Sequence, residues 1–148
     1  MKLLSKLFKA KPRKTFEVPD IGPFTLDYSS KAKNSWSIES DDVLIVVRGS
    51  VNEPFAEHLS FIRKIDSEIQ KFSDRISEKF RTAFLQAEQD VHFQKWEDAF
   101  RIEAIEINLV HEGDVYWNVT FEQLDAPYYH FTIFVEGNML GPDFAIDS

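Results

Sequence analysis

Cysteine is absent from this chain of 148 residues, and glycine is scarce, with five residues in all. Without cysteine the chain can form no disulfide, no thiolate metal site and no thiol nucleophile. The five glycines are too widely spread to make a phosphate-binding loop, and no G-x-S-x-G elbow is present. The sequence therefore lacks the common short signatures of catalysis, and no catalytic residue or cofactor is assigned from it.

Long apolar runs are also missing. No stretch approaches the roughly 18 consecutive apolar residues that predict a membrane-spanning helix. The first residues, Met1–Lys9, interrupt their apolar positions with lysines, so they are not expected to act as a signal peptide. The absence of cysteine is typical of a reducing compartment. These features together predict a soluble, cytoplasmic protein.

Positive charge is missing from the last third of the chain, because no lysine or arginine follows Arg101. Those 47 residues carry nine carboxylates, whereas Met1–Lys14 holds six basic residues and no acidic one, within a net charge of −8. A surface of one sign attracts molecules of the opposite sign. The acidic part predicts a basic protein partner and disfavours direct binding to nucleic acid.

Length and composition predict one globular domain. A chain of this size with 43% hydrophobic residues and 14 phenylalanines can bury its own core. Residues 15–148 are assigned to that domain, and Met1–Lys14 to a basic, flexible N-terminal arm. The arm is interpreted either as a solvated terminus or as an anchor to a membrane surface or an acidic partner. Membrane contact is expected only through this arm.

Apolar spacing predicts helical structure over residues 54–88. Apolar residues recur there at intervals of three and four, and no glycine or proline occurs between Pro54 and Gly113. The segment is expected to be one long helix, or two helices joined near Ser73-Asp74, with Asn52 or Ser50 as the cap. A short helix or turn anchored by Trp96 and Phe100 is expected to follow.

Extended segments are predicted on both sides of this helical region. Val43–Val47 is apolar at every position, which favours a central strand covered on both faces. Four later segments predict a β-meander, at residues 104–110, 115–121, 128–135 and 139–146. The predicted fold is α+β, with a mostly antiparallel sheet, a C-terminal meander, and one long helix or helix pair on one face. Strict alternation turns one set of side chains towards the helices, namely Ile105, Ile107, Leu109, Trp117, Val119, Phe131 and Ile133.

The same alternation turns polar and aromatic side chains towards water. Tyrosines beside amide and hydroxyl groups are typical of protein interfaces, although an ordinary solvated sheet face has a similar composition. Carboxylates at the rim favour the interface, because such a face can imitate a nucleic-acid backbone. The candidate partner-binding residues are Glu106, Asn108, Glu112, Asp114, Tyr116, Asn118, Thr120, Glu122, Tyr128 and His130.

Two alternative functions remain open from the residues alone. A small hydrolase or ligand-binding enzyme would use His130 or the turn His111–Asp114. A peripheral membrane or scaffold module would use the basic arm. The four histidines lie far apart in the sequence and show no metal-site spacing, so no metal ligand is assigned.

The order of these elements resembles a group of small bacterial α+β domains of unknown function. The resemblance is carried by the basic start, Pro19-Asp-Ile-Gly-Pro-Phe24, a Trp-containing strand, and a long helical segment ending near Trp96 and Phe100. It continues in Ile105-Glu-Ile107 with its acidic Gly turn, and in His130-Phe-Thr-Ile-Phe-Val135. Some members are encoded beside contact-dependent toxins as immunity proteins. The resemblance implies a non-catalytic module that neutralises a basic, nuclease-type toxin.

Overall fold

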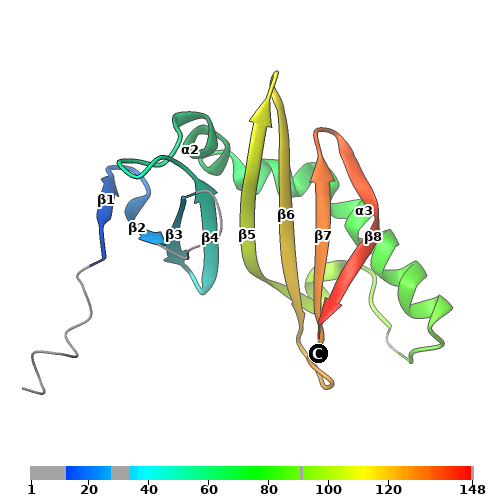
Figure 1. The fold of residues 1–148 in the computed structure, drawn as a ribbon. Coiled ribbons are helices and arrows are strands. Elements are labelled where there is room, and N and C mark those ends of the chain that lie inside the picture. The colour runs from blue at the N-terminus through cyan, green and yellow to red at the C-terminus, as the bar shows by residue number, and fades with distance from the viewer. Residues whose placement is uncertain (1–12, 28–33, 91, 148) are drawn as a thin grey trace, which may run out of the picture.

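Eight strands form one sheet, and they lie in it in the order in which they occur in the chain (Figure 1). The computed structural model describes residues 13–27, 34–90 and 92–147. The first half of the sheet contains β1 (Thr15–Val18), β2 (Gly22–Asp27), β3 (Ser35–Ser40) and β4 (Val43–Arg48). The second half contains β5 (Phe100–His111), β6 (Asp114–Gln123), β7 (His130–Glu136) and β8 (Met139–Asp147).

All neighbouring strands are antiparallel except β4 and β5, which pair in parallel. The chain crosses between them through α2 (Ala56–Ile62), α3 (Ile65–Gln86) and the short 3-10 helix η1 (Trp96–Asp98). Both α-helices lie over the same face of the sheet (Figure 1). This arrangement confirms the predicted α+β fold, including the C-terminal meander. Neither helix in the described residues is long and apolar enough to cross a membrane.

The core lies between these helices and the sheet. The meander residues that the alternation turns towards the helices are, apart from Leu109, buried in one apolar cluster. The same cluster contains helix residues, among them Leu59, Ile62, Ile69 and Phe72. The Trp117 ring stands edge-on to Phe61 and Phe72, with centroids 5.1 and 6.3 Å away. Farther along α3, Phe80 is fully buried and stacks on Phe100 at 4.2 Å. Other rings around Phe80 are Phe121, Phe131 and Phe144.

The helical segment is two helices, but the predicted joint near Ser73-Asp74 is wrong. The break lies at Arg63 and Lys64, where Lys64 leaves helical geometry with φ −114° and ψ 15°. It turns the chain, so that α2 covers the sheet near β4 and β5 while α3 continues towards β8 (Figure 1). An ion pair of 2.6 Å from Arg63 to Asp20 ties the joint to the β1–β2 turn.

Ser73 has a different role within an unbroken α3. Its hydroxyl oxygen accepts the indole N–H of Trp96 at 3.0 Å, and the Ser77 hydroxyl accepts the backbone N–H of Trp96 at 2.9 Å. Both serines are buried, so these bonds satisfy polar groups that would otherwise be unpaired in the core. These two bonds hold η1 against α3. Trp96 is buried and anchors η1, as predicted.

The expected helix cap is also wrong. Phe55 occupies the N-cap of α2 and has no side-chain cap, while Pro54 forms an isolated antiparallel bridge with Gly49. The Ser50 hydroxyl instead accepts the N–H groups of Asn52 and Glu53 in the preceding turn. The helix starts at Ala56, two residues after Pro54, because Pro54 is extended in the bridge with Gly49.

β4 is central in the sheet, as predicted, but it is covered on one face only. Ile45 and Val47 are buried under the helices, whereas Leu44 on the other face is 42% exposed. Val46 is half-buried between its strand neighbours Ser37 and Glu106. The apolar run reflects the preference of branched side chains for strands, and that preference does not require a second covering layer.

A bulge in β5 overturns the predicted direction of Leu109. The register of β5 against β6 shifts between Ile107 and Leu109, so Asn108 is an extra residue there. Leu109 pairs with Tyr116 on the face away from the helices and is 51% exposed. One extra residue reverses the alternation after it, and the pattern of residue types does not mark the insertion.

The predicted basic arm falls mainly on residues 1–12, which lie outside the described residues. Lys14 belongs to the described fold, because its carbonyl accepts the N–H of Leu26 at 2.8 Å. Its ammonium donates to the carbonyl of Val51 at 2.7 Å.

The Phe80 cluster predicts a large loss of stability on truncation. We expect Phe80→Ala to lower the free energy of unfolding by about 3–5 kcal/mol, since the fully buried ring leaves a cavity among other rings. Phe134→Ala is the matched control, because Phe134 is 45% exposed on the opposite face and should change stability by about 0.5 kcal/mol or less. Urea unfolding measures both. Equal effects would contradict the assignment of the two faces.

His58 predicts a loss of stability in mild acid. It is buried in the first turn of α2, and its Nδ1 accepts the backbone N–H of Arg48 at 3.3 Å. Burial lowers the pKa of His58 below its ordinary 6.5; Glu57 opposes this and the charge of Arg48 adds to it. The unfolded chain therefore takes up a proton at a higher pH than the fold does, so stability falls as the pH drops below that ordinary value.

The measurement is the urea midpoint at about pH 7.5 and about pH 5.5. We expect a lower midpoint in acid, and a smaller difference in His58→Asn, because asparagine can accept the same N–H but cannot be protonated. An unchanged difference in this variant would assign the pH dependence to other groups.

Candidate functional site

The face of the sheet away from the helices carries the candidate site. We call it the open face, and the strand register arranges its outward side chains in four rows across β4–β8. No described element covers it (Figure 1). The rows are Leu109-Tyr116-Glu136-Met139, then Val46-Glu106-Asn118-Phe134, then Leu44-Ala104-Thr120-Thr132-Ala145, and last Arg101-Glu122-His130-Asp147.

Apolar side chains are exposed at one end of the open face, close to the β5–β6 and β7–β8 hairpins. Met139 is 72% exposed, Leu109 51% and Phe134 45%. The half-buried Tyr116 pairs directly with Leu109. Single exposed apolar residues are normal, but here three of them lie in two adjacent rows of the sheet together with a tyrosine.

Hydrogen-bonding groups fill the middle of the open face. Asn118 lies between Glu106 and Phe134 in its row, and the hydroxyls of Thr120 and Thr132 bond each other at 2.9 Å. These side chains stand on adjacent strands, so the sheet itself fixes their spacing. The middle of the face is therefore an ordered polar surface.

Three carboxylates of this region are already paired with cationic or basic groups. Glu106 accepts from Arg48 at 2.9 Å, and Glu122 forms an ion pair with Arg101. Glu103 lies at a second β5 bulge and contacts His130 Nδ1 at 2.7 Å. The negative charge of the face is reduced at these positions. The sequence did not indicate these pairs, because Arg48 lies 58 residues before Glu106.

Other carboxylates lie at the rim of the apolar end. Glu112 is in the β5–β6 hairpin, Asp114 starts β6, and Glu136 ends β7. All three are exposed. Within the described part of the chain none of them is paired with a lysine or arginine; Glu112 has only His111 near it, at 3.9 Å. They are the carboxylates of this region that remain available to an incoming cation.

The predicted partner-binding residues do not form one compact patch. Asn108 lies in the bulge, and Glu112 and Asp114 lie at the hairpin. Tyr128 lies in the β6–β7 turn, at the opposite end of the strands, with a φ of 58° and 56% exposure (Figure 1). The remaining predicted residues share the open face: Glu106, Tyr116, Asn118, Thr120, Glu122 and His130.

The histidines of the alternative enzyme interpretation lie on exposed surfaces. The side chain of His130 is 32% exposed, and its cross-strand neighbours are the carboxylates Glu122 and Asp147. A histidine oriented by Glu103 can serve as a base, but catalysis also needs a bound substrate within reach. A cavity of about 400 Å³ lies on the helix-covered side, and His130 does not line it. Among the described residues no three His, Asp or Glu side chains gather as a metal site would require.

Sequence alternation could have identified one further member of the site. In the segment from His130 to Val135, Phe134 falls on the same side as His130 and Thr132, and the structure places it there. Leu109 could not have been found in this way, because the bulge reverses its side. Met139 follows a turn, and alternation does not predict which face a side chain occupies directly after a turn.

Comparison of the chain with protein-family models, with curated proteins and with solved structures finds no match. The function of this protein is therefore inferred from the geometry of the open face.

The ion pairs on this face are expected to contribute little to folding. Arg101 is about half exposed, and exposed pairs are typically coupled by about 0–1 kcal/mol. A double-mutant cycle of Arg101→Ala and Glu122→Ala, measured by urea unfolding, should give a coupling energy in that range. A coupling of several kcal/mol would show that the pair stabilises the sheet and is not free to exchange partners.

Proposed function

We propose that this protein is a non-catalytic binding module that holds a basic protein partner against the apolar end of its open face. In its specific form, implied by the resemblance to toxin-associated domains, the partner is a nuclease-type toxin and the module is its immunity protein.

The observation that carries this proposal is the composition of the uncovered face. Exposed Phe134, Leu109 and Met139 lie in the two adjacent rows that also hold Tyr116 and the amide of Asn118. Protein interfaces are enriched in aromatic residues and methionine at their centre and have a polar rim. If a second layer of helices covered this face, these side chains would be buried in the protein's own core.

The charges at the rim indicate the sign of the charge on the partner's contact surface. Glu112, Asp114 and Glu136 lie beside the apolar centre, and no lysine or arginine pairs with them in the described residues. Rim carboxylates attract a cationic surface over long range and disfavour an acidic one. Glu106 and Glu122 contribute less than the sequence suggested, since Arg48 and Arg101 pair with them.

The partner can be identified by pull-down from the native organism, followed by mass spectrometry. The protein recovered should be basic at its contact surface, and a toxin gene directly upstream would support the immunity role. A partner with an acidic contact surface would overturn the proposal.

Charge reversal at the rim predicts slower association with that partner. Glu112→Lys, Asp114→Lys and Glu136→Lys together should lower the association rate constant by about tenfold or more, because steering by rim charges is lost. The matched control reverses three exposed acids elsewhere, Glu53, Asp74 and Glu78, for the same change in net charge.

Two further measurements separate steering from contact. Raising the salt concentration from about 0.05 to 0.5 M should lower the association rate constant of the wild type and leave that of the rim variant nearly unchanged. Phe134→Ala should act mainly on dissociation, since contact residues set the lifetime of a complex. Phe55→Ala, equally exposed at 45% but outside the sheet, is its control. An unchanged salt dependence in the rim variant would refute the steering role.

A further inference from the structure

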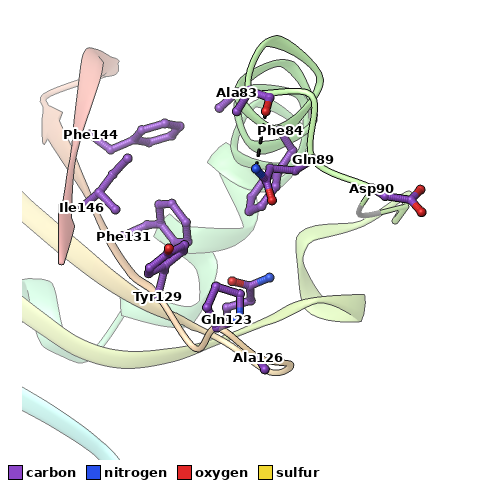
Figure 2. Close-up of a pocket in the computed structure, with 12 residues that line it drawn as sticks. Ala83, Phe84, Gln89, Asp90, Gln123, Ala126, Tyr129, Phe131, Phe144 and Ile146 are labelled. Atoms are coloured by element: carbon purple, nitrogen blue, oxygen red, sulfur yellow. Dashed lines mark hydrogen bonds between the residues drawn. The ribbon is translucent and has the colours of Figure 1, made fainter. Parts of the chain in front are cut away.

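A cavity of about 400 Å³ lies on the helix-covered side of the sheet, where α3 ends (Figure 2). Its walls come from the last turns of α3, the β6–β7 turn, and strands β7 and β8. Cavities of this size accommodate small organic molecules. The cavity and the open face lie on opposite sides of the sheet, so a ligand in the cavity would not occupy the surface proposed for the protein partner.

Aromatic rings form much of the cavity wall. Phe131 stands edge-on to Tyr129 at 6.4 Å and close to edge-on to Phe144 at 6.0 Å, and the Phe84 ring is tilted against it by 59° at 5.7 Å. Ala83 contributes only a methyl group on the helix side, which leaves space between α3 and these rings. Rings arranged in this way favour a planar aromatic guest through stacked and edge-to-face contacts.

Gln123 supplies a polar group that the fold leaves unused. Its side chain is almost fully buried, at 4% exposure, and lines the cavity. Figure 2 shows the carboxamide between the β6–β7 turn and the chain leaving α3. Its Oε1 atom is buried and has no hydrogen-bond partner among the described residues. Buried acceptors are nearly always paired, because an unpaired one is destabilising.

The main chain that carries this carboxamide is hydrogen-bonded to two other segments. The N–H of Gln123 donates to the carbonyl of Tyr129 at 2.9 Å, across the turn. The N–H of the next residue, Leu124, donates to the carbonyl of Ala99, also at 2.9 Å. Two backbone bonds to separate segments fix the main chain from which the Gln123 side chain enters the cavity wall.

The charge of the cavity limits the guest to a neutral molecule. Asp90 is the one acidic or basic residue among those that line it; its side chain is 96% exposed and pairs with His92 at 2.9 Å. A charged guest would lose its hydration without gaining an opposite charge in the buried part. We propose that the cavity binds a small, neutral, planar aromatic molecule that donates one N–H or O–H hydrogen bond to Gln123 Oε1.

Indole and 1-methylindole are suitable probes, because they differ in the single N–H that the proposal requires. Titration calorimetry on the full-length protein should show binding of indole. The affinity of 1-methylindole should be weaker by about tenfold or more, since it leaves the acceptor unpaired. In a ¹H–¹⁵N spectrum the side-chain amide signals of Gln123 should shift with indole.

Gln123→Met tests the acceptor while keeping the length of the side chain. Because it removes a buried unpaired oxygen, the free variant should melt at the same temperature as the wild type or higher. It should also bind the two probes with equal affinity. The exposed Gln70→Met on α3 is the control and should preserve the preference for indole.

Ala83→Leu tests the cavity itself, because it adds bulk to the helix side and leaves Gln123 intact. Leucine has a high helix propensity, so the variant should fold. It should lower the affinity for both probes by the same factor. The proposal is overturned if neither probe binds, or if 1-methylindole binds as tightly as indole. It also fails if Gln123→Met lowers the melting temperature of the free protein, because the amide would then serve the fold.

Discussion

The parallel pairing of β4 with β5 is the contact on which the rest of this structure depends. Ile45 lies opposite Ile105 and Val47 opposite Ile107, and these pairs join two local meanders into one sheet. Parallel neighbours cannot be linked by a tight turn, so the chain must cross over between them. That crossover contains both α-helices, and the apolar cluster is therefore a consequence of this one pairing.

The open face is a result of the same constraint. A single crossover supplies a single layer of helices, and the second face of the sheet has no described element to cover it. Its side chains have then to be compatible with water, with one another, and with whatever binds there. Arg48 balances Glu106 in the middle of the face and Arg101 balances Glu122 at one end, while the exposed apolar side chains lie at the other end with Glu112, Asp114 and Glu136.

Residue patterns were sufficient for the features that repeat. The alternation in β6, with Trp117 and Val119 inward and Tyr116 and Asn118 outward, fixed the two faces of the meander correctly. The spacing of apolar residues along the helical segment also identified most of the buried stripe, although it omitted Phe61 and Phe84, which are buried as well. Both patterns have a constant period, and burial against a flat layer follows that period.

Single irregularities were not predictable. The β5 bulge at Asn108 and the helix break at Lys64 carry no glycine or proline to mark them. The pairing of Arg48 with Glu106 depends on which strands become neighbours, and a sequence pattern does not show that. The unpaired oxygen of Gln123 likewise depends on which segments pack around the end of β6, and a sequence pattern does not show that.

The edge formed by β8 limits how another chain can attach to this sheet. Pro142 has no N–H to offer there, and the register of β7 against β8 shifts between Ile133 and Val135. Lys79 donates to the carbonyls of Gly141 and Pro142 at 2.9 and 2.6 Å. An extended strand added alongside β8 would meet occupied acceptors and a missing donor. Growth of the sheet by strand addition, including the uncontrolled kind that leads to fibrils, is therefore disfavoured along this stretch of the edge.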